Sequence, residues 1–346
     1  MDVRIYGSEP RGELRAMASK SDVHRALICA AFSDKETFIG SNADSSDMEA
    51  TAGCLRAAGA DIVYDSQRQG FVVRPIRPSS SVMADCRESG STLRFLIPVF
   101  AAAGLTASYS GQGRLPERPL GPILDELRAH GMDIQGDRLP LTISGRLSSG
   151  SFSLPGDVSS QFITGLLLSF PLMKGASELR LTTELQSSAY VDITMDTMRR
   201  FGAEIDRRDR RFLYGGGPGT YVSPGVYEAD GDWSNAAFFL AADSLLGGGH
   251  IDIRGLREDS VQGDRRIASI LRGIADGSHR VMDASEVPDL VPIVAVTMAL
   301  SQGHFEIINA GRLRIKESDR LSAMAEGLRR LGAEVEELQE GLVIEG

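Results

Sequence analysis

The chain has 346 residues, a length that favours two domains, and it carries a formal net charge of −10. This acidic balance argues against a protein that coats nucleic acid, because phosphate backbones need a basic surface. The three cysteines form no C-x-x-C pair and predict neither a zinc site nor a disulfide framework. The N-terminus has no apolar signal core, and the longest apolar run, residues 290–300, is too short to span a bilayer. We therefore expect a cytoplasmic protein with no metal and no membrane contact.

A short phrase recurs along the chain and indicates a duplicated unit. The phrase begins with leucine or methionine followed by arginine, and a glycine stands four positions after its first residue. It begins at Leu55, Leu127, Met198 and Leu328, and a related Leu271-Arg-Gly precedes the last copy. Each copy is typical of the last turn of a helix, a glycine just beyond it and entry into a strand. Successive copies are 71 to 73 residues apart, except for the last two, which are 57 apart. The pattern predicts a repeated α/β unit, with most of a strand and turn missing after the fourth copy.

Polar and cationic side chains fall repeatedly at predicted helix starts. These starts are Ser19-Lys20-Ser21, Ser89-Gly90-Ser91, Glu117-Arg118-Pro119, Ser159-Ser160-Gln161, Pro288-Asp289 and Lys316-Glu317-Ser318-Asp319-Arg320. Taken singly, each residue has an ordinary role as an N-cap, a turn residue or a surface charge. Together they favour anion binding, because free N–H groups and the positive end of the helix dipole attract phosphate, and Lys and Arg add charge-assisted hydrogen bonds.

The same segments carry a resemblance to a known family. From about residue 8 to residue 346 the chain resembles the 5-enolpyruvylshikimate-3-phosphate synthases, the enolpyruvyl transferases of the shikimate pathway. The motifs, in chain order, are Ser19-Lys20-Ser21-x-x-x-Arg25, Ser89-Gly90-Ser91-Thr92-x-Arg94, Glu117-Arg118-Pro119, Asp157-Val-Ser-Ser-Gln161, Tyr190-Val-Asp-Ile-Thr, Gln262-Gly-Asp, Pro288-Asp289 and Arg314-Ile-Lys-Glu-Ser-Asp-Arg320. The resemblance implies an α/β, two-lobed enolpyruvyl transferase fold built from repeated βαβαββ units. We expect residues 1–15 plus 225–346 to form the first lobe and residues 16–224 the second, with the Gly-rich segment 215–224 as a linker.

By this resemblance, the protein transfers the enolpyruvyl group of phosphoenolpyruvate to the 5-hydroxyl of shikimate 3-phosphate and releases phosphate, without a cofactor. The phosphate of shikimate 3-phosphate would bind Ser159, Ser160 and Ser187. The ring would be surrounded by Ser21, Arg25, Gln161, Tyr190, Asp289 and Lys316. Phosphoenolpyruvate would contact Lys20, Gly90, Arg118, Gln161 and Arg320.

The implied chemistry needs one proton to leave the attacking hydroxyl and another to reach C3 of phosphoenolpyruvate. Asp289 is the candidate base and Glu317 the candidate proton shuttle, with Lys20 and Lys316 stabilising developing charge. Gly90 predicts sensitivity to glyphosate, a herbicide that mimics phosphoenolpyruvate, because a methyl group there would intrude. We expect a monomer whose partners are the two small-molecule substrates.

The resemblance is incomplete and leaves alternatives open. The family continues past residues 342–344 to an Asn-Asp-His-Arg segment and a later lysine on the phosphoenolpyruvate side, and this sequence contains neither. We therefore expect an incomplete first lobe. The alternative function is a non-catalytic remnant that binds shikimate 3-phosphate, or a fragment that needs a complementing chain. A UDP-N-acetylglucosamine enolpyruvyl transferase is disfavoured because residues 111–118 hold no cysteine, and an RNA 3′-phosphate cyclase because of the acidic charge.

Overall fold

The computed structural model describes residue 7 and residues 10–77, 81–316 and 318–346, and the chain forms two compact units. Unit 1 is Met1–Met17 with Gly231–Gly346, and unit 2 is Ala18–Asp230. The chain therefore leaves unit 2 after Asp230 rather than at the expected 224/225. The reason is that β13 (Val226–Glu228) pairs in parallel with β2 (Thr37–Gly40). The Gly-rich segment 215–224 consequently lies inside unit 2.

Unit 2 contains three four-stranded sheets with the same strand order, a parallel pair followed by an antiparallel hairpin. In order across each sheet, the strands are β5 (Ser81–Asp85), β6 (Thr106–Ser110), β8 (Leu141–Ser144) and β7 (Asp133–Gln135); β9 (Ser151–Leu154), β10 (Ser177–Leu181), β12 (Arg211–Tyr214) and β11 (Asp206–Arg208); and β13, β2, β4 (Gly70–Arg74) and β3 (Asp61–Asp65). Side chains alternate between a buried and an exposed face, as in β5, where Val82 and Ala84 are buried and Met83 is exposed. This alternation is expected for a sheet with one face packed on helices.

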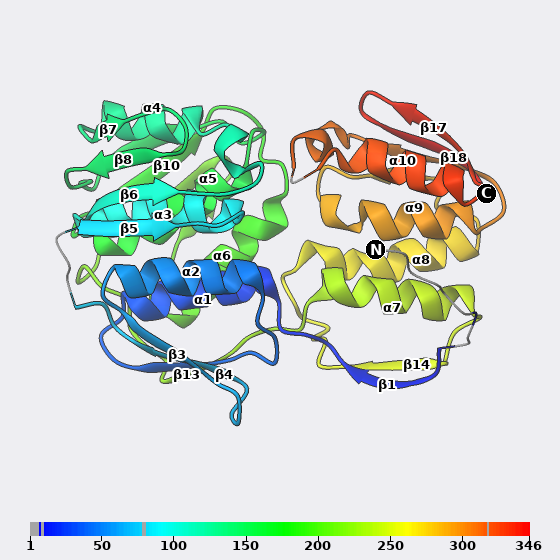
Figure 1. Ribbon diagram of the computed structural model, residues 1–346, viewed down its shortest axis with the longest axis horizontal. Coiled ribbons are helices and arrows are strands. Elements are labelled where there is room, and N and C mark those ends of the chain that lie inside the picture. The colour runs from blue at the N-terminus through cyan, green and yellow to red at the C-terminus, as the bar shows by residue number, and fades with distance from the viewer. Residues whose placement is uncertain (1–6, 8–9, 78–80, 317) are drawn as a thin grey trace. The chain divides into compact units, whose positions relative to one another are not determined.

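Two helices accompany each of these sheets (Figure 1). They are α1 (Lys20–Ala31) and α2 (Ser46–Ala57), α3 (Gly90–Ala103) and α4 (Gly121–Ala129), and α5 (Ser160–Ser169) and α6 (Ser188–Arg200), with 3₁₀ turns η1 (Leu115–Glu117) and η2 (Phe170–Leu172). The order β-α-β-α-β-β holds along the chain for β5 to β8 and for β9 to β12. In the third sheet, β13 supplies the first strand from the far end of the unit. The predicted repetition of βαβαββ units is confirmed.

Unit 1 holds one four-stranded sheet of the same order and one parallel pair. The sheet runs β15 (Val281–Asp283), β16 (His304–Ile308), β18 (Gly341–Glu345) and β17 (Glu334–Leu338), and the pair is β1 (Gly12–Arg15) with β14 (Ile251–Arg254). The helices are α7 (Trp233–Leu245), α8 (Ile267–Ala275), α9 (Val291–Ala299) and α10 (Arg320–Arg330), with turns η3 (Gly263–Arg266), η4 (Pro288–Leu290) and η5 (Gly311–Ile315). Residues 276–280, all of them described, join α8 to β15 without a strand, at the place where the sequence repeat is short.

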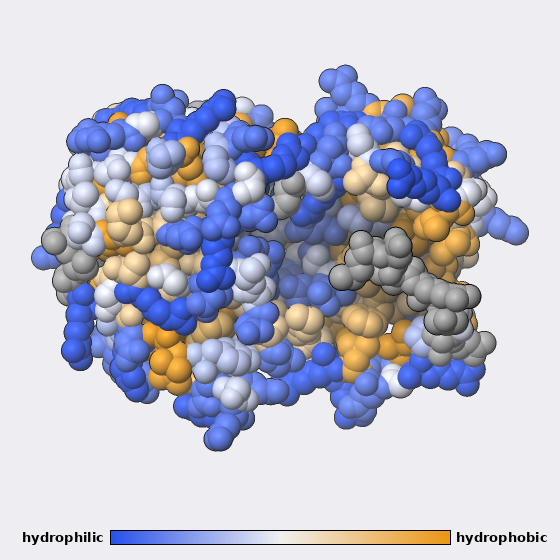
Figure 2. Space-filling view, viewed as in Figure 1, coloured by the Kyte–Doolittle hydropathy of each residue, from blue (hydrophilic) through white to orange (hydrophobic). Residues whose placement is uncertain are grey.

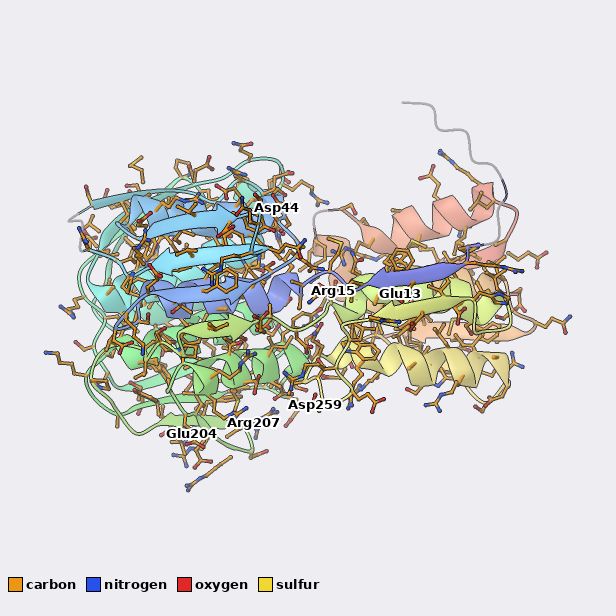
Figure 3. The ribbon with its side chains drawn as sticks, turned by 90° about the horizontal axis from the view of Figure 1, so that it is seen from below. Glu13, Arg15, Asp44, Glu204, Arg207 and Asp259 are labelled. Atoms are coloured by element: carbon orange, nitrogen blue, oxygen red, sulfur yellow. The ribbon has the colours of Figure 1, made fainter. Side chains whose placement is uncertain are left out.

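The β1–β14 pair is reinforced by charge. Figure 3 shows Glu13 and Arg15 along β1, and Glu13 forms an ion pair with Arg254 of β14 at 2.6 Å. Both side chains are exposed, so this pair adds little stability on its own. Figure 2 shows hydrophilic side chains over most of the visible face, as expected for a chain with 24% charged residues.

Four of the five copies of the recurring phrase end helices as predicted, whereas at the related copy Gly273 lies inside α8. Glycines follow α2, α4, α6 and α10 at Gly59, Gly131, Gly202 and Gly332, with φ values of +105°, +82°, +76° and +97°. Only glycine adopts this left-handed conformation without strain, which is why it recurs at this position.

Each unit has its own hydrophobic core, and that of unit 2 depends on the close packing of α3 against α5. Gly165 allows this approach. A Cβ at that position would clash with the Arg94 carbonyl oxygen and lie 3.0 Å from Cγ of Pro98. The two helix axes therefore lie closer than ordinary side chains permit.

We predict that Gly165→Ala destabilises the protein by about 1–3 kcal/mol, because α3 and α5 must separate to admit the methyl group. The matched control is Gly53→Ala in α2, where a Cβ meets nothing within 4 Å and higher helix propensity should add up to about 1 kcal/mol. Urea unfolding followed by circular dichroism measures both changes. Equal effects of the two substitutions would contradict the packing argument.

Candidate active site

Arg25, in the second turn of α1, joins three helices of unit 2, α1, α5 and α6. Its Nε donates to the Thr194 hydroxyl at 2.8 Å, and its Nη2 donates to the Tyr190 carbonyl oxygen at 2.9 Å and to the Thr164 hydroxyl at 3.4 Å. Its Nη1 donates to the Ser21 carbonyl oxygen. The side chain is buried, and burial lowers the pKa of Arg25 to about 10, so it remains cationic at neutral pH. Because these partners are neutral oxygens, the positive charge stays available to an anion.

Gln161 connects the starts of α3 and α5. Its Nε2 donates to Ser91 Oγ at 2.9 Å, and its Oε1 accepts from Arg94 Nη1 at 2.5 Å. The backbone N–H of Gln161 donates to Ser159 Oγ at 3.3 Å, which makes Ser159 the N-cap of α5. Ser160 is the first residue of this helix. Partners on both sides of the amide therefore fix the orientation of Gln161.

Arg118 lies directly against the start of α3. A Cβ at Gly90 would be 2.5 Å from its Nη1 and 2.9 Å from its Cζ. Arg118 is only 8% exposed, and Gly90 is buried as well. The start of the helix is capped by Ser89, whose Oγ accepts from the Thr92 N–H at 3.3 Å. Glycine at position 90 therefore lets a guanidinium group reach the positive end of a helix, a combination that suits a bound anion.

Lys20 is half-exposed at the start of α1, where its Nζ donates to Asp47 Oδ2 at 2.8 Å. A buried chain of polar groups runs behind it. Nδ1 of His24 lies 2.6 Å from Thr51 Oγ1, which lies 2.7 Å from Thr92 Oγ1. Burial lowers the pKa of His24 to about 3, so its ring is neutral and serves the packing of α1, α2 and α3.

Ser187 holds the N-cap position of α6 in an unusual conformation. Its φ is +56°, in the left-handed region, and the residue is buried. Its carbonyl oxygen accepts from the Tyr190 N–H at 3.2 Å. A non-glycine residue held in this region is often found at a ligand site, because surrounding contacts must maintain the strain.

In unit 1, Asp289 and Arg320 form an ion pair. Nη1 of Arg320, the first residue of α10, donates to Oδ1 of Asp289 in η4 at 2.7 Å, and both side chains are partly exposed. Asp319 caps α10 by accepting from the Ser322 N–H at 3.1 Å. Lys316 ends η5 and is partly buried, whereas the predicted proton shuttle Glu317 lies outside the described residues.

Asp264 is an acidic residue of this region that the sequence analysis did not select. It lies in η3 and is buried. Burial, helped by the negative charges of Asp289 and Asp232, raises its pKa to about 8, against a hydrogen bond with Ser234 that lowers it. The Gln262-Gly-Asp motif marked the position, but the burial that perturbs this carboxyl group depends on the fold.

The structure thus groups the predicted residues by unit. Unit 2 holds Lys20, Ser21, Arg25, Gly90, Arg118, Ser159, Ser160, Gln161, Ser187 and Tyr190 at or beside helix starts, and unit 1 holds Asp289, Lys316 and Arg320. Hydrogen bonds directly join the starts of α1 and α6, and those of α3 and α5. Among the described residues, no helix is long and apolar enough to cross a membrane, and no group of three or more His, Cys, Asp or Glu side chains suits a metal ion.

Repeated βαβαββ units define an α/β protein, and the cations and hydroxyl groups at its helix starts favour the binding of anions. Residues 6–346 match the sequence model of the family described as EPSP synthase (3-phosphoshikimate 1-carboxyvinyltransferase). Given this match over nearly all of its length, the chain belongs to the EPSP synthase family.

Individual relatives agree with this assignment. A 3-phosphoshikimate 1-carboxyvinyltransferase of Clostridium acetobutylicum is 42% identical over 356 residues, covering 97% of this chain and 82% of that protein. The protein of the same name from Clostridium kluyveri is 40% identical, covering 99% of this chain and 84% of its own length. A solved structure of EPSP synthase from Acinetobacter baumannii has a TM-score of 0.78 at 22% identity, covering 98% of this chain and 83% of that one. This likeness supports the fold.

We predict that Asp264→Asn stabilises the protein increasingly as the pH rises. The folded pKa of Asp264 is raised above its unfolded value of 3.8, so the native state loses stability as the pH rises between 3.8 and about 8. Replacement by a neutral amide should raise the free energy of unfolding near pH 8 by more than about 1 kcal/mol relative to pH 5. Thermal unfolding across this pH range measures the effect.

The control is Asp276→Asn. Hydrogen bonds from Ser278 lower the pKa of Asp276, so its replacement should bring no gain as the pH rises. The same pH dependence in both variants would show that the effect does not come from the buried carboxyl group.

Proposed function

We propose that this protein transfers the enolpyruvyl group of phosphoenolpyruvate to the 5-hydroxyl of shikimate 3-phosphate, with release of phosphate. Membership of the EPSP synthase family supports the reaction. The observation that carries the proposal for this chain is the set of buried or fixed cations and amides at joined helix starts, with Arg25, Gln161 and Arg118 as its centre.

Shikimate 3-phosphate binds mainly through unit 2 in this proposal. Its phosphate is bound by Ser159, Ser160 and Ser187, at the starts of α5 and α6, where helix N–H groups favour a dianion. The ring is surrounded by Ser21, Arg25, Gln161, Tyr190, Asp289 and Lys316. The hydrogen bonds that fix Arg25 and Gln161 in advance reduce the entropy lost on binding.

Phosphoenolpyruvate binds Lys20, Gly90, Arg118, Gln161 and Arg320. Its carboxylate and phosphate are both negatively charged and need charge-assisted hydrogen bonds. Three of these five residues, Lys20, Arg118 and Arg320, are therefore cations. At Gly90, the bare backbone lets the substrate and Arg118 approach the start of α3 together.

The reaction exchanges one C–O bond for another through a tetrahedral adduct. Asp289 accepts the proton of the 5-hydroxyl as its oxygen attacks C2, and Glu317 delivers a proton to C3. Loss of the C3 proton with cleavage of the C2–O bond to phosphate then restores the double bond. The hydrogen bond from Arg320 orients Asp289, and the Lys20 and Lys316 ammonium groups stabilise negative charge on the adduct.

The setting of the protein is part of the same proposal. The three cysteines are free and buried, as expected in a reducing compartment, and the net charge of −10 disfavours nucleic acid. We therefore assign the protein to the cytoplasm, as a monomer with small-molecule substrates.

We predict that Asp289→Ala abolishes turnover, by a factor of at least about 10²–10⁴, while shikimate 3-phosphate still binds. A phosphate-release assay with both substrates measures turnover, and calorimetry with shikimate 3-phosphate alone measures binding. Retained turnover would refute the role of Asp289.

Lys20→Met should weaken both readouts, because Lys20 contacts substrate and stabilises charge. In the unmodified protein, binding without phosphate release would identify the non-catalytic alternative.

We predict that Gly90→Ala weakens inhibition by glyphosate and raises the KM for phosphoenolpyruvate by about tenfold or more, because the added methyl group displaces Arg118. The control is Gly121→Ala at the start of α4, where a Cβ would approach only Asp125, at 3.9 Å. Steady-state kinetics with varied phosphoenolpyruvate measure both variants. If glyphosate inhibits the unmodified protein only at concentrations far above that of phosphoenolpyruvate, the proposed phosphoenolpyruvate site is contradicted.

A further inference from the structure

A cavity of about 330 Å³ lies in unit 2 away from the residues of the proposed reaction. Two bends of the chain form it, residues 146–149 after β8 and residues 172–175 at the end of η2. Its volume falls within the range of small-molecule sites.

The cavity lies at the opposite end of α3 and α5 from the proposed active site. The Leu147 N–H donates to the carbonyl oxygen of Ala101, in the last turn of α3, whereas Gly90 begins that helix. A helix of 14 residues is about 20 Å long, so the two places are separate. None of the residues that line the cavity has a part in the proposed reaction.

The rim of the cavity is cationic and its floor is apolar. Arg146 and Lys174 are exposed, as are Ser148 and Ser149, while Leu147, Leu172 and Met173 are buried. Over the described part of the chain, the side chains of Arg146, Lys174, Ser148 and Ser149 form no hydrogen bond or ion pair. The chain has 47 acidic and 37 basic residues, yet neither of the two cations that line this cavity is paired with a carboxylate among the described residues.

Glycines fix the geometry of the rim. A Cβ at Gly175 would clash with Ser149 Oγ and lie 3.0 Å from Ser149 Cβ, so the two bends approach each other closely at this glycine. A Cβ at Gly104 would lie 3.4 Å from Cδ of Arg146, and one at Gly219 would lie 3.5 Å from Cγ of Lys174. The stems of both cations thus lie along backbone, and their charged ends remain exposed.

The negative end of α3 does not account for these cations. The Ala101 carbonyl oxygen accepts from the N–H groups of Gly104 and Leu147, and the Phe100 carbonyl oxygen accepts from Leu105. Backbone groups therefore already satisfy these terminal carbonyl oxygens, and neither Arg146 nor Lys174 caps the helix.

We propose that this cavity is a second anion site, which binds a small organic phosphate with an apolar body. The phosphate dianion matches the charges of Arg146 and Lys174 and accepts hydrogen bonds from the two serine hydroxyls. The apolar body covers Leu172 and Met173. The proposal stands apart from the enolpyruvyl transfer reaction, because the two sites share no residue.

Phenyl phosphate is the probe, since it combines a dianion with an apolar ring, and the methyl group of Met173 reports on the cavity itself. Protein labelled with ¹³C-methyl methionine is titrated with phenyl phosphate, and Met173→Leu assigns the signal. We expect the Met173 signal to shift and saturate at millimolar or lower concentration. In the double variant Arg146→Gln/Lys174→Gln, saturation should need about tenfold or more probe.

The control variant is Lys35→Gln, which removes another exposed lysine of unit 2 and should leave the titration unchanged. Inorganic phosphate and phenol serve as partial probes, and each should bind more weakly than phenyl phosphate. An unmoved Met173 signal, an unaltered titration in the double variant, or binding of either partial probe as tight as that of phenyl phosphate would each overturn the proposal. Because the readout is local and needs no turnover, it is independent of the proposed reaction.

Discussion

The burial of Arg25 among α1, α5 and α6 is the interaction on which the arrangement of these three helices depends. Removing a guanidinium group from water costs several kcal/mol unless its donors are satisfied. Here, hydroxyl and carbonyl oxygens from all three helices satisfy them without cancelling the charge. The same bonds hold the three helices together, so one side chain fixes the packing and supplies a fixed positive potential.

Unit 1 has a different electrostatic character. Asp289 is paired with Arg320, and the buried Asp264 lies within the field of Asp289 and Asp232. The carboxyl group of Asp264 resists ionisation, because burial and then these two negative charges raise its pKa. Such a region suits proton transfer better than tight anion binding, in keeping with the acid–base role proposed for Asp289. In the proposed reaction, unit 2 supplies most of the substrate-binding cations, whereas unit 1 supplies Asp289 together with the binding residues Lys316 and Arg320.

Local sequence patterns predicted much of this structure, whereas contacts between elements remote in sequence could not be predicted. The glycines after α2, α4, α6 and α10 revealed the repeat because only a left-handed residue ends those helices without strain. The helix starts were predicted from local residues too, because Ser and Asp favour the N-cap position. By contrast, the Gly-rich segment 215–224 looked like a linker, and its place within unit 2 is shown by the pairing of β13 with β2 and by the bridge between Ser33 and Tyr221. The bond between Gln161 and Arg94 and the perturbed pKa of Asp264 likewise depend on packing between elements remote in sequence.

The pairing of β1 with β14 has a consequence for biosynthesis. These strands are neighbours in space, yet β1 ends at Arg15 and β14 begins at Ile251. During translation, β1 emerges first and must wait for its partner while all of unit 2 is made. Contacts so distant in sequence slow folding, because closing a long loop costs entropy before any contact compensates. Prior folding of unit 2 shortens that loop, so the order of synthesis favours completion of the central portion of the chain before its two ends assemble.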